Sequence, residues 1–136
     1  METKTIKLDK PYLKNIYNLE KEKKYAKDVI KNVYERWMNE SNYNHFQYAL
    51  EALEEYRYVA AKYVIPNGRY IRYIDLKDPY DAKLRLGGFV IYDNGYSVTF
   101  MNKGKFIKIN KKRAKAIFVR ISDDEILRSQ FEKFSD

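Results

Sequence analysis

The sequence of 136 residues contains no cysteine and a single histidine, His45. Without cysteine the chain has no disulfide bond, no thiolate nucleophile and no zinc–thiolate site, which suits a reducing compartment. One histidine does not build a multi-histidine metal site, so we expect His45 to be a capping or surface residue. The sequence also lacks a Gly-rich phosphate loop and a nucleophile elbow. We therefore expect a non-enzymatic protein with no catalytic residue, no metal site and no cofactor.

Long apolar runs are missing as well. No stretch approaches the roughly 20 apolar residues that a helix needs to span a bilayer. The first ten residues lack the apolar core of a signal peptide. We therefore expect no membrane span, and an intracellular protein or one packaged inside a particle rather than a secreted one.

Glycine is absent before Gly68, and the first part of the chain has helical periodicity. After an arm, the sequence predicts a short helix near Pro11 and two longer helices over residues 25–38 and 43–64, because apolar residues recur there every three or four positions. Ser41 or Asn42 is the expected N-cap of the second long helix. Their short connection predicts an antiparallel pair. Residues 1–65 are thus expected to form a helical arm and a helix pair.

All five glycines lie between Gly68 and Gly104, where aromatic and β-branched residues predict short strands. We expect five of them, over residues 69–76, 88–93, 96–101, 105–110 and 116–121. The pair Asn94-Gly95 predicts a type I′ hairpin turn, and Asn102-Lys103-Gly104 predicts a slightly longer one. Gly87-Gly88 indicates a bulge or a close backbone approach. Five short strands in meander order are typical of small SH3-like or Tudor-like antiparallel β-barrels.

The C-terminal segment begins with Ser122-Asp123-Asp124-Glu125, a capping box for a short final helix. Leu127, Phe131 and Phe134 are its expected docking face. The predicted fold class is therefore α+β, with the N-terminal helix pair packed on the five-stranded barrel. Residues 66–136 hold the barrel and the C-terminal helix, and we expect both parts to form one folded unit.

Acidic residues are missing from the whole stretch between Asn94 and Ser122, in a chain whose net charge is +8. This charge pattern favours a polyanionic partner, either nucleic acid or an acidic protein. Two alternatives remain. The lysines would protect an exposed edge strand from pairing with another chain, or the positive net charge would only keep the protein soluble. The candidate nucleic-acid-binding residues are Lys103, Lys105, Lys108, Lys111, Lys112, Arg113, Lys115, Arg69 and Arg72.

Tyrosine is abundant, with 14 copies, and it serves cores and contact surfaces equally well. In the strand beginning at Arg69, alternation places Tyr70 and Arg72 on one face and Arg69 and Tyr73 on the other. An exposed Tyr/Arg face would stack bases, whereas a barrel strand with one buried face is the alternative. Asp75, Asp78, Asp81 and Asp93 would hold a cation if they gathered at one end of the barrel, but aspartates beside Pro or Gly fit turn chemistry better. A second hypothesis is a Tudor- or SH3-like protein-interaction module, whose aromatic groove would consist of Tyr70, Tyr73, Tyr92 and Tyr96.

The block Gly-Arg-Tyr-Ile-Arg-Tyr-Ile-Asp-Leu, the later Leu-Gly-Gly-Phe-Val and the final Ile-Phe-Val-Arg resemble short basic virion-associated proteins of large nucleocytoplasmic DNA viruses. The resemblance covers residues 68–121 and carries over no active-site residue. It implies a structural or nucleic-acid-associated virion protein, located in the host cytoplasm, in the virion or in both. Its partners would be DNA, RNA or acidic viral proteins.

Overall fold

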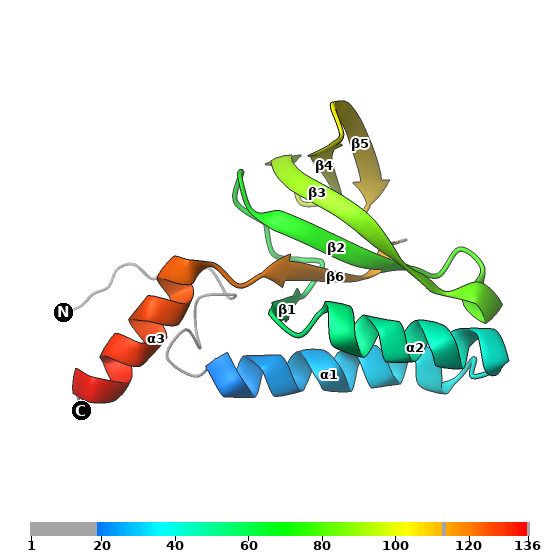
Figure 1. Cartoon of the computed structure of the whole chain (residues 1–136). Coiled ribbons are helices and arrows are strands. Elements are labelled where there is room, and N and C mark those ends of the chain that lie inside the picture. Colours follow the sequence, from blue (N-terminus) through cyan, green and yellow to red (C-terminus); the bar gives the residue numbers. More distant parts are fainter. Residues whose placement is uncertain (1–18, 113, 136) are drawn as a thin grey trace.

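The computed structural model describes residues 19–112 and 114–135, so the predicted arm and the helix near Pro11 lie outside the described residues. The fold is α+β, as the sequence predicts. Helices α1 and α2 run antiparallel beneath the sheet, and α3 follows the last strand (Figure 1). In chain order the elements are α1 (Leu19–Glu35), α2 (Glu40–Ala52), β1 (Tyr56–Val59), β2 (Tyr70–Asp75), η4 (Pro79–Asp81), β3 (Lys83–Asp93), β4 (Ser97–Asn102), β5 (Lys105–Asn110), β6 (Ala114–Arg120) and α3 (Asp123–Ser135).

The described strands form one antiparallel sheet of six, in the order β1-β6-β2-β3-β4-β5. The prediction of a small five-stranded SH3-like or Tudor-like barrel is wrong in the number of strands, and the sheet does not close into a barrel. Strand β1 is the additional strand, and it pairs with β6 from Tyr56 opposite Arg120 to Val59 opposite Ile117. The sheet is open, because β1 and β5 are its two edge strands and each pairs with one neighbour among the described strands.

The second helix is shorter than predicted, because α2 ends at Ala52 instead of near residue 64. The next residues are Tyr56-Arg57-Tyr58-Val59, aromatic and β-branched types that fit a half-buried strand. The N-cap is Asn39, neither Ser41 nor Asn42: the Asn39 side chain accepts the backbone N–H of Asn42 at 2.7 Å. Strand β1 therefore lies in the part of the chain that was predicted to be helical.

Both faces of the central strands are buried. On one face, Ile74 and Phe118 pack against Ala26, Ile30 and other side chains of the two helices. On the opposite face, the sheet curls over a second core. That core contains Val59, Ile65, Ile71, Val90, Val98, Phe100, Ile117 and Val119. Helices α1 and α2 pack against β1, β6, β2 and the start of β3, and none of the described helices packs on the outer face of β4 and β5.

The glycine-containing turns differ from the prediction. In the β4–β5 hairpin, Asn102 pairs with Lys105, and Lys103 and Gly104 have φ angles of 51° and 79°. This is the two-residue loop with two positive φ angles that defines type I′. In the β3–β4 turn only Gly95 has a positive φ, so the prediction of a type I′ turn at Asn94-Gly95 is wrong. The shorter of the two hairpins is the second one.

The capping box of α3 is confirmed. The Glu125 carboxylate accepts the Ser122 N–H at 3.0 Å, and the Ser122 hydroxyl accepts the Glu125 N–H at 3.1 Å. The predicted docking face is wrong at Leu127, whose side chain is 65% exposed. The side chains of Phe131 and Phe134 lie outside the described residues. The start of α3 is fixed by Glu125, which also binds Arg69 of the sheet.

We predict that Gly87→Ala prevents stable folding or lowers the free energy of unfolding by at least about 3 kcal/mol. The pair Gly87-Gly88 is confirmed as a close approach, because a Cβ at Gly87 would lie 1.9 Å from the carbonyl oxygen of Ile71. Urea denaturation checks the prediction, with Lys83→Ala as a control on the same strand. A stable Gly87→Ala protein would contradict the tight packing of β3 on β2.

We predict that protein stability falls between pH 10 and pH 12, and that Tyr34→Phe reduces this fall. Burial, with a smaller effect of Asp81, raises the pKa of Tyr34 to about 12. Its hydroxyl donates a hydrogen bond to the carbonyl oxygen of Ala82. An unfolded tyrosine loses its proton near pH 10, so between these values the native state holds more protons and stability drops as pH rises. Urea titrations at pH 8 and pH 11 measure the fall in the free energy of unfolding. An equal fall in Tyr34→Phe and in wild type would contradict the prediction. Tyr43→Phe, on exposed Tyr43, is the control.

Candidate nucleic-acid interface

Lys111 is not a surface lysine. Its side chain is 1% exposed, and its Nζ lies 2.7 Å from Oδ2 of Asp93 and 2.6 Å from the carbonyl oxygen of Tyr63. The Asp93 carboxylate also accepts the backbone N–H groups of Ile65 and Gly95. The prediction that Lys111 contacts phosphates is therefore wrong, because its charge is used inside the protein.

The candidate arginines Arg69, just before β2, and Arg72, within β2, also make internal contacts. The Arg69 guanidinium donates to Glu125 at 2.7 Å and to the Arg120 carbonyl at 2.9 Å. Arg72 is buried; it donates to the Arg85 carbonyl at 3.2 Å and lies over the ring of Tyr48. These contacts tie β2 to α3, β3 and α2, so neither arginine forms part of an open basic face.

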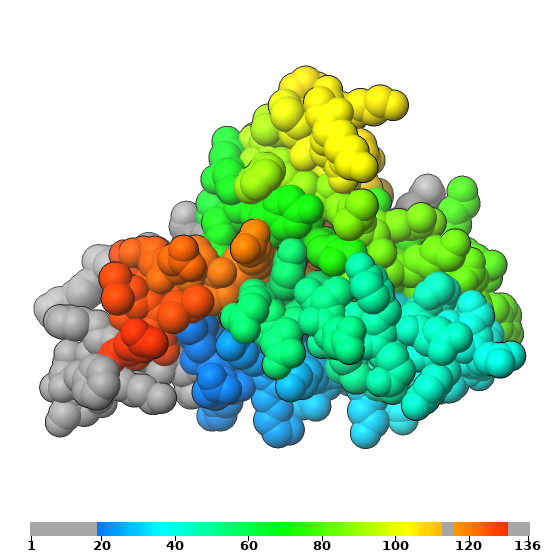
Figure 2. Space-filling model, in the orientation of Figure 1, coloured from blue at the N-terminus to red at the C-terminus, as the bar shows by residue number. Residues whose placement is uncertain are grey.

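Four of the remaining basic candidates lie on the β4–β5 hairpin or directly after it. Lys103, Lys105, Lys108 and Lys112 are exposed, whereas the side chains of Arg113 and Lys115 lie outside the described residues. The hairpin stands out from the body of the molecule (Figure 2). Lys105 is opposite Asn102 and Lys108 is opposite Thr99, so the two lysines point to different faces of β5, as the sequence predicts.

The four candidate tyrosines do not form one groove. Tyr70 packs against the core between the helices and the sheet, whereas Tyr73 packs against the core on the concave side of the curled sheet. The two tyrosines therefore lie on opposite faces of β2. Tyr92 and Tyr96 are exposed, at 61% and 79%. The structure therefore separates the tyrosines that the groove hypothesis brings together.

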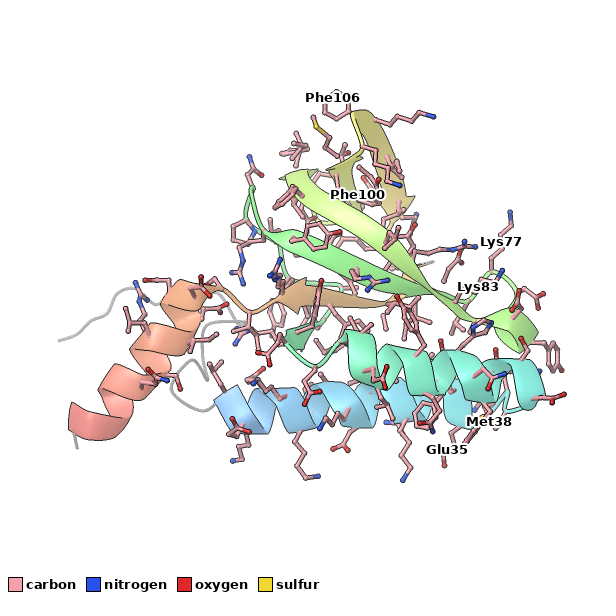
Figure 3. The ribbon with its side chains drawn as sticks, viewed as in Figure 1. Glu35, Met38, Lys77, Lys83, Phe100 and Phe106 are labelled. Carbon is pink, nitrogen blue, oxygen red and sulfur yellow. The ribbon has the colours of Figure 1, made fainter. Side chains whose placement is uncertain are left out.

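An exposed aromatic face, which the sequence analysis did not identify, lies on the outer side of β3, β4 and β5. Phe89 is opposite Met101, and Met101 is opposite Phe106, so these three side chains form one row across three strands. Phe89 and Phe106 are 54% and 66% exposed. Figure 3 shows Phe106 at the far end of the hairpin, whereas Phe100 lies within the curl of the sheet. Alternation alone did not reveal the face, because its exposure depends on where the helices stop.

A second row runs beside the first on the same outer face. Tyr92 is opposite Thr99, and Thr99 is opposite Lys108. The register shift between Val90 and Tyr92 leaves Ile91 as an additional exposed residue. We call these two rows the outer face, and define it by Phe89, Ile91, Tyr92, Thr99, Met101, Phe106 and Lys108.

The outer face carries no carboxylate of its own. Asp93 is the only acidic residue of the sequence between Lys83 and Ile121. Its side chain is buried and bound to Lys111, on the opposite side of the sheet from Tyr92. Exposed aromatic rings and a lysine ammonium group therefore lie together on the outer face. Because none of the residues of this face carries a carboxylate, the face would repel an incoming phosphate only weakly.

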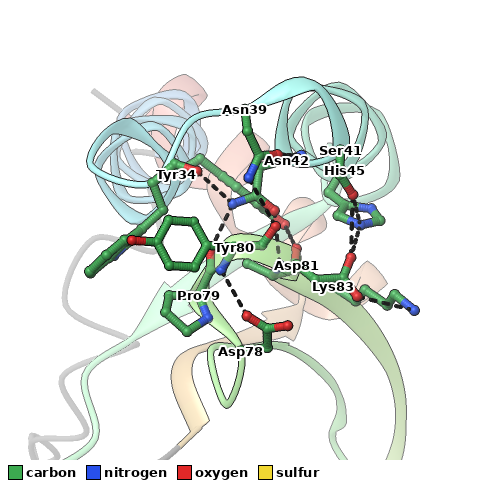
Figure 4. Close-up of polar contacts among 12 residues, drawn as sticks. Tyr34, Asn39, Ser41, Asn42, His45, Asp78, Pro79, Tyr80, Asp81 and Lys83 are labelled. Atoms are coloured by element: carbon green, nitrogen blue, oxygen red, sulfur yellow. Dashed lines mark hydrogen bonds and ion pairs between the residues drawn. The ribbon is translucent and has the colours of Figure 1, made fainter.

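A polar cluster around His45 connects α2 to the η4 turn (Figure 4). His45 Nε2 lies 2.8 Å from Asp81 and 3.4 Å from the Ser41 hydroxyl. The hydrogen bond from His45 is the main reason why the pKa of the Asp81 carboxyl is lowered. A Ser-His-Asp triad needs one ring nitrogen for the serine and the other for the carboxylate, whereas here the same nitrogen faces both. The arrangement is a structural link, and Asn42 supports it with bonds to Pro79 and Ala82.

The described residues contain no group of three or more His, Cys, Asp or Glu side chains arranged to hold a metal ion. None of the helices in the described ranges is long and apolar enough to cross a membrane.

Comparisons with known proteins add no assignment. No protein-family model matches the chain, and neither a curated protein nor a solved structure matches it.

We predict that Lys111→Met lowers the free energy of unfolding by about 3–5 kcal/mol, because the substitution leaves the buried Asp93 carboxylate without its counter-charge. Lys108→Met is the control, since Lys108 is an exposed lysine of β5, and we expect a change within about 0.5 kcal/mol. Denaturant unfolding of both variants makes the comparison. Similar stabilities for the two would show that the pair is not a structural anchor.

Proposed function

We propose that this protein is a non-enzymatic nucleic-acid-binding protein that holds a single strand on its outer face. The observation that carries the proposal is the exposure of Phe89, Tyr92 and Phe106 on one face of neighbouring strands, together with Lys108. Single strands bind to surfaces that combine aromatic rings for the bases with cations for the backbone.

The spacing of the rings favours unpaired bases. Phe89 and Phe106 stand two strands apart, at about 10 Å, which leaves space for bases to stack on each ring separately. In a duplex the base faces are already stacked on one another, so an aromatic sheet face offers a duplex few contacts. Lys103 at the hairpin tip and Lys108 on the face supply cations for phosphates along this path.

A protein partner is the second candidate for the same face. Ile91 and Met101 are exposed beside the aromatic rings, and contiguous apolar surface of this kind is typical of protein contacts. A partner of this type would carry acidic groups around an apolar centre, opposite Lys103 and Lys108. The virion-associated role implied by the resemblance is compatible with either ligand, a packaged genome or an acidic virion protein, and it stays a prediction.

We predict that the protein binds a fluorescent single-stranded 12-mer more tightly than the corresponding duplex. Phe89→Ser and Phe106→Ser should each weaken binding by about 5- to 150-fold, since a stacked base contributes about 1–3 kcal/mol. Tyr43→Ser is the matched control, because Tyr43 is an equally exposed aromatic residue on α2, 53% exposed. Fluorescence anisotropy measures all four proteins.

A salt series separates the two candidate partners. Lys108→Ala should reduce the slope of log affinity against log salt by about 0.7 for a single strand. Equal single-strand affinities for wild type, Phe89→Ser and Phe106→Ser would contradict nucleic-acid binding on this face, and would leave the protein partner as the candidate.

A further inference from the structure

The two edge strands of the sheet differ in their exposure. Helix α1 packs on β1, and three of the four β1 residues are buried. In β5, by contrast, five of the six residues are exposed, and the strand lies at the edge of the sheet away from α1 and α2 (Figure 1). An exposed edge strand offers its backbone groups to a further strand.

The register of the β4–β5 pair shows which backbone groups of β5 face the open edge. The backbone N–H of Lys111 donates to the Tyr96 carbonyl oxygen at 2.9 Å, at the position that continues the β4–β5 ladder. Hydrogen-bonded and non-hydrogen-bonded pairs alternate along an antiparallel ladder. Every second residue back from Lys111 therefore bonds to β4, and the residues between them face outward. The outward-facing residues, whose N–H and C=O groups point to the open edge, are Phe106, Lys108 and Asn110.

The core on the concave side of the sheet also ends at β5. Ile107 is opposite Phe100, and Ile109 is opposite Val98. Phe100 and Val98 are 1% and 0% exposed, whereas Ile107 is 37% exposed. Apolar residues on an added strand would cover Ile107 and Ile109, as β5 covers the core residues of β4.

The charge of β5 decides which added strand fits. Lys105 and Lys108 are exposed lysines of β5, and exposed Lys103 precedes them at the hairpin tip. A second copy of this chain is a poor partner. The antiparallel register that pairs all three outward-facing residues places Lys108 directly opposite Lys108 of the other copy, and like charges in this position are destabilising. Acidic residues opposite the lysines would instead form cross-strand ion pairs.

We infer that the β5 edge binds an extended acidic segment of another protein, which adds to the sheet as an antiparallel strand. In this register an acidic residue opposite Lys108 stands between two apolar residues, which face Ile107 and Ile109. A second acidic residue, three positions after the first, faces Lys105. Backbone hydrogen bonds supply affinity in such strand additions, and alternate side chains supply specificity. The inference goes beyond the proposed function, because the contact is made with the backbone of the edge and not with the aromatic rings of the outer face.

Fluorescence anisotropy with a labelled peptide, Ser-Val-Glu-Val-Thr-Glu-Ser, tests the inference. The peptide should bind about tenfold more tightly than a peptide with lysine in place of both glutamates. N-methylation of the first glutamate removes the N–H that would donate to the Lys108 carbonyl, and it should weaken binding about tenfold. N-methylation of the second valine is the matched control, because its N–H would point away from β5. Equal binding of the two N-methylated peptides would overturn the inference.

Two substitutions of Lys108 locate the contact on the protein. Lys108→Ala and Lys108→Pro both remove the ammonium group, but only proline removes the outward N–H. Proline is tolerated in an edge strand where its nitrogen faces solvent, and Lys108→Pro should weaken peptide binding at least about fivefold more than Lys108→Ala. Equal weakening by the two variants would show a contact with the side chain alone and would overturn the inference. The N-methylated peptides make the same comparison on the wild-type protein, so the test does not depend on the folding of the proline variant.

Phe89→Ser separates this site from the outer face, because Phe89 is on β3, two strands away from β5. The variant should leave peptide affinity unchanged, whether or not it weakens a single strand. A loss of peptide binding in Phe89→Ser would assign the peptide to the outer face and overturn the inference. Sedimentation of the wild-type protein tests the second copy as the occupant. A dimer that Lys108→Pro dissociates would assign the edge to self-association, which would also overturn the inference.

Discussion

The buried ion pair between Lys111 and Asp93 is the contact on which the curled half of the sheet depends. Its two charges lie 2.7 Å apart, with backbone groups of Tyr63, Ile65 and Gly95 satisfying their remaining hydrogen-bonding capacity. The pair therefore connects the end of β5, the β3–β4 turn and the segment after β1. A buried pair is stable only when its polar atoms are satisfied in this way, and the satisfied network fixes one geometry.

The same geometry decides which side chains face the solvent. The segment after β1 closes the inside of the curl, where Val90, Val98 and Phe100 pack. Helices α1 and α2 cover the opposite side over β1, β6, β2 and the start of β3. Phe89 and Phe106 lie beyond the helices, so they are exposed although they alternate with core residues in the usual way. A surface of aromatic rings without carboxylates is the result, and it is the physical basis of the proposed binding.

The position of each basic side chain, more than the number of basic residues, decides how much positive charge the protein presents to a partner. Of nine basic candidates from the sequence, Lys111, Arg69 and Arg72 hold the fold together through buried or partly buried contacts. Lys103, Lys105, Lys108 and Lys112 remain at the surface. The distinction matters because a lysine or arginine bound to an internal carboxylate or carbonyl adds little field outside the protein. In the described part of the chain, the candidate lysines that reach the solvent lie on and next to the β4–β5 hairpin.

Local patterns in the sequence determined the α+β class, the helix pair and the capping box at Ser122, because each depends on neighbours in the chain. The pair Gly87-Gly88 indicated a close approach, but the pairing of β2 with β3 decided that its partner is Ile71. Strand β1, the open sheet and the roles of Lys111 and Arg72 were decided by the tertiary structure. Tyr56–Val59 is a strand because β6 lies beside it, and Lys111 is buried because Asp93, 18 residues away, reaches it. Pairing and burial of this kind depend on long-range contacts, which periodicity and charge counts do not contain.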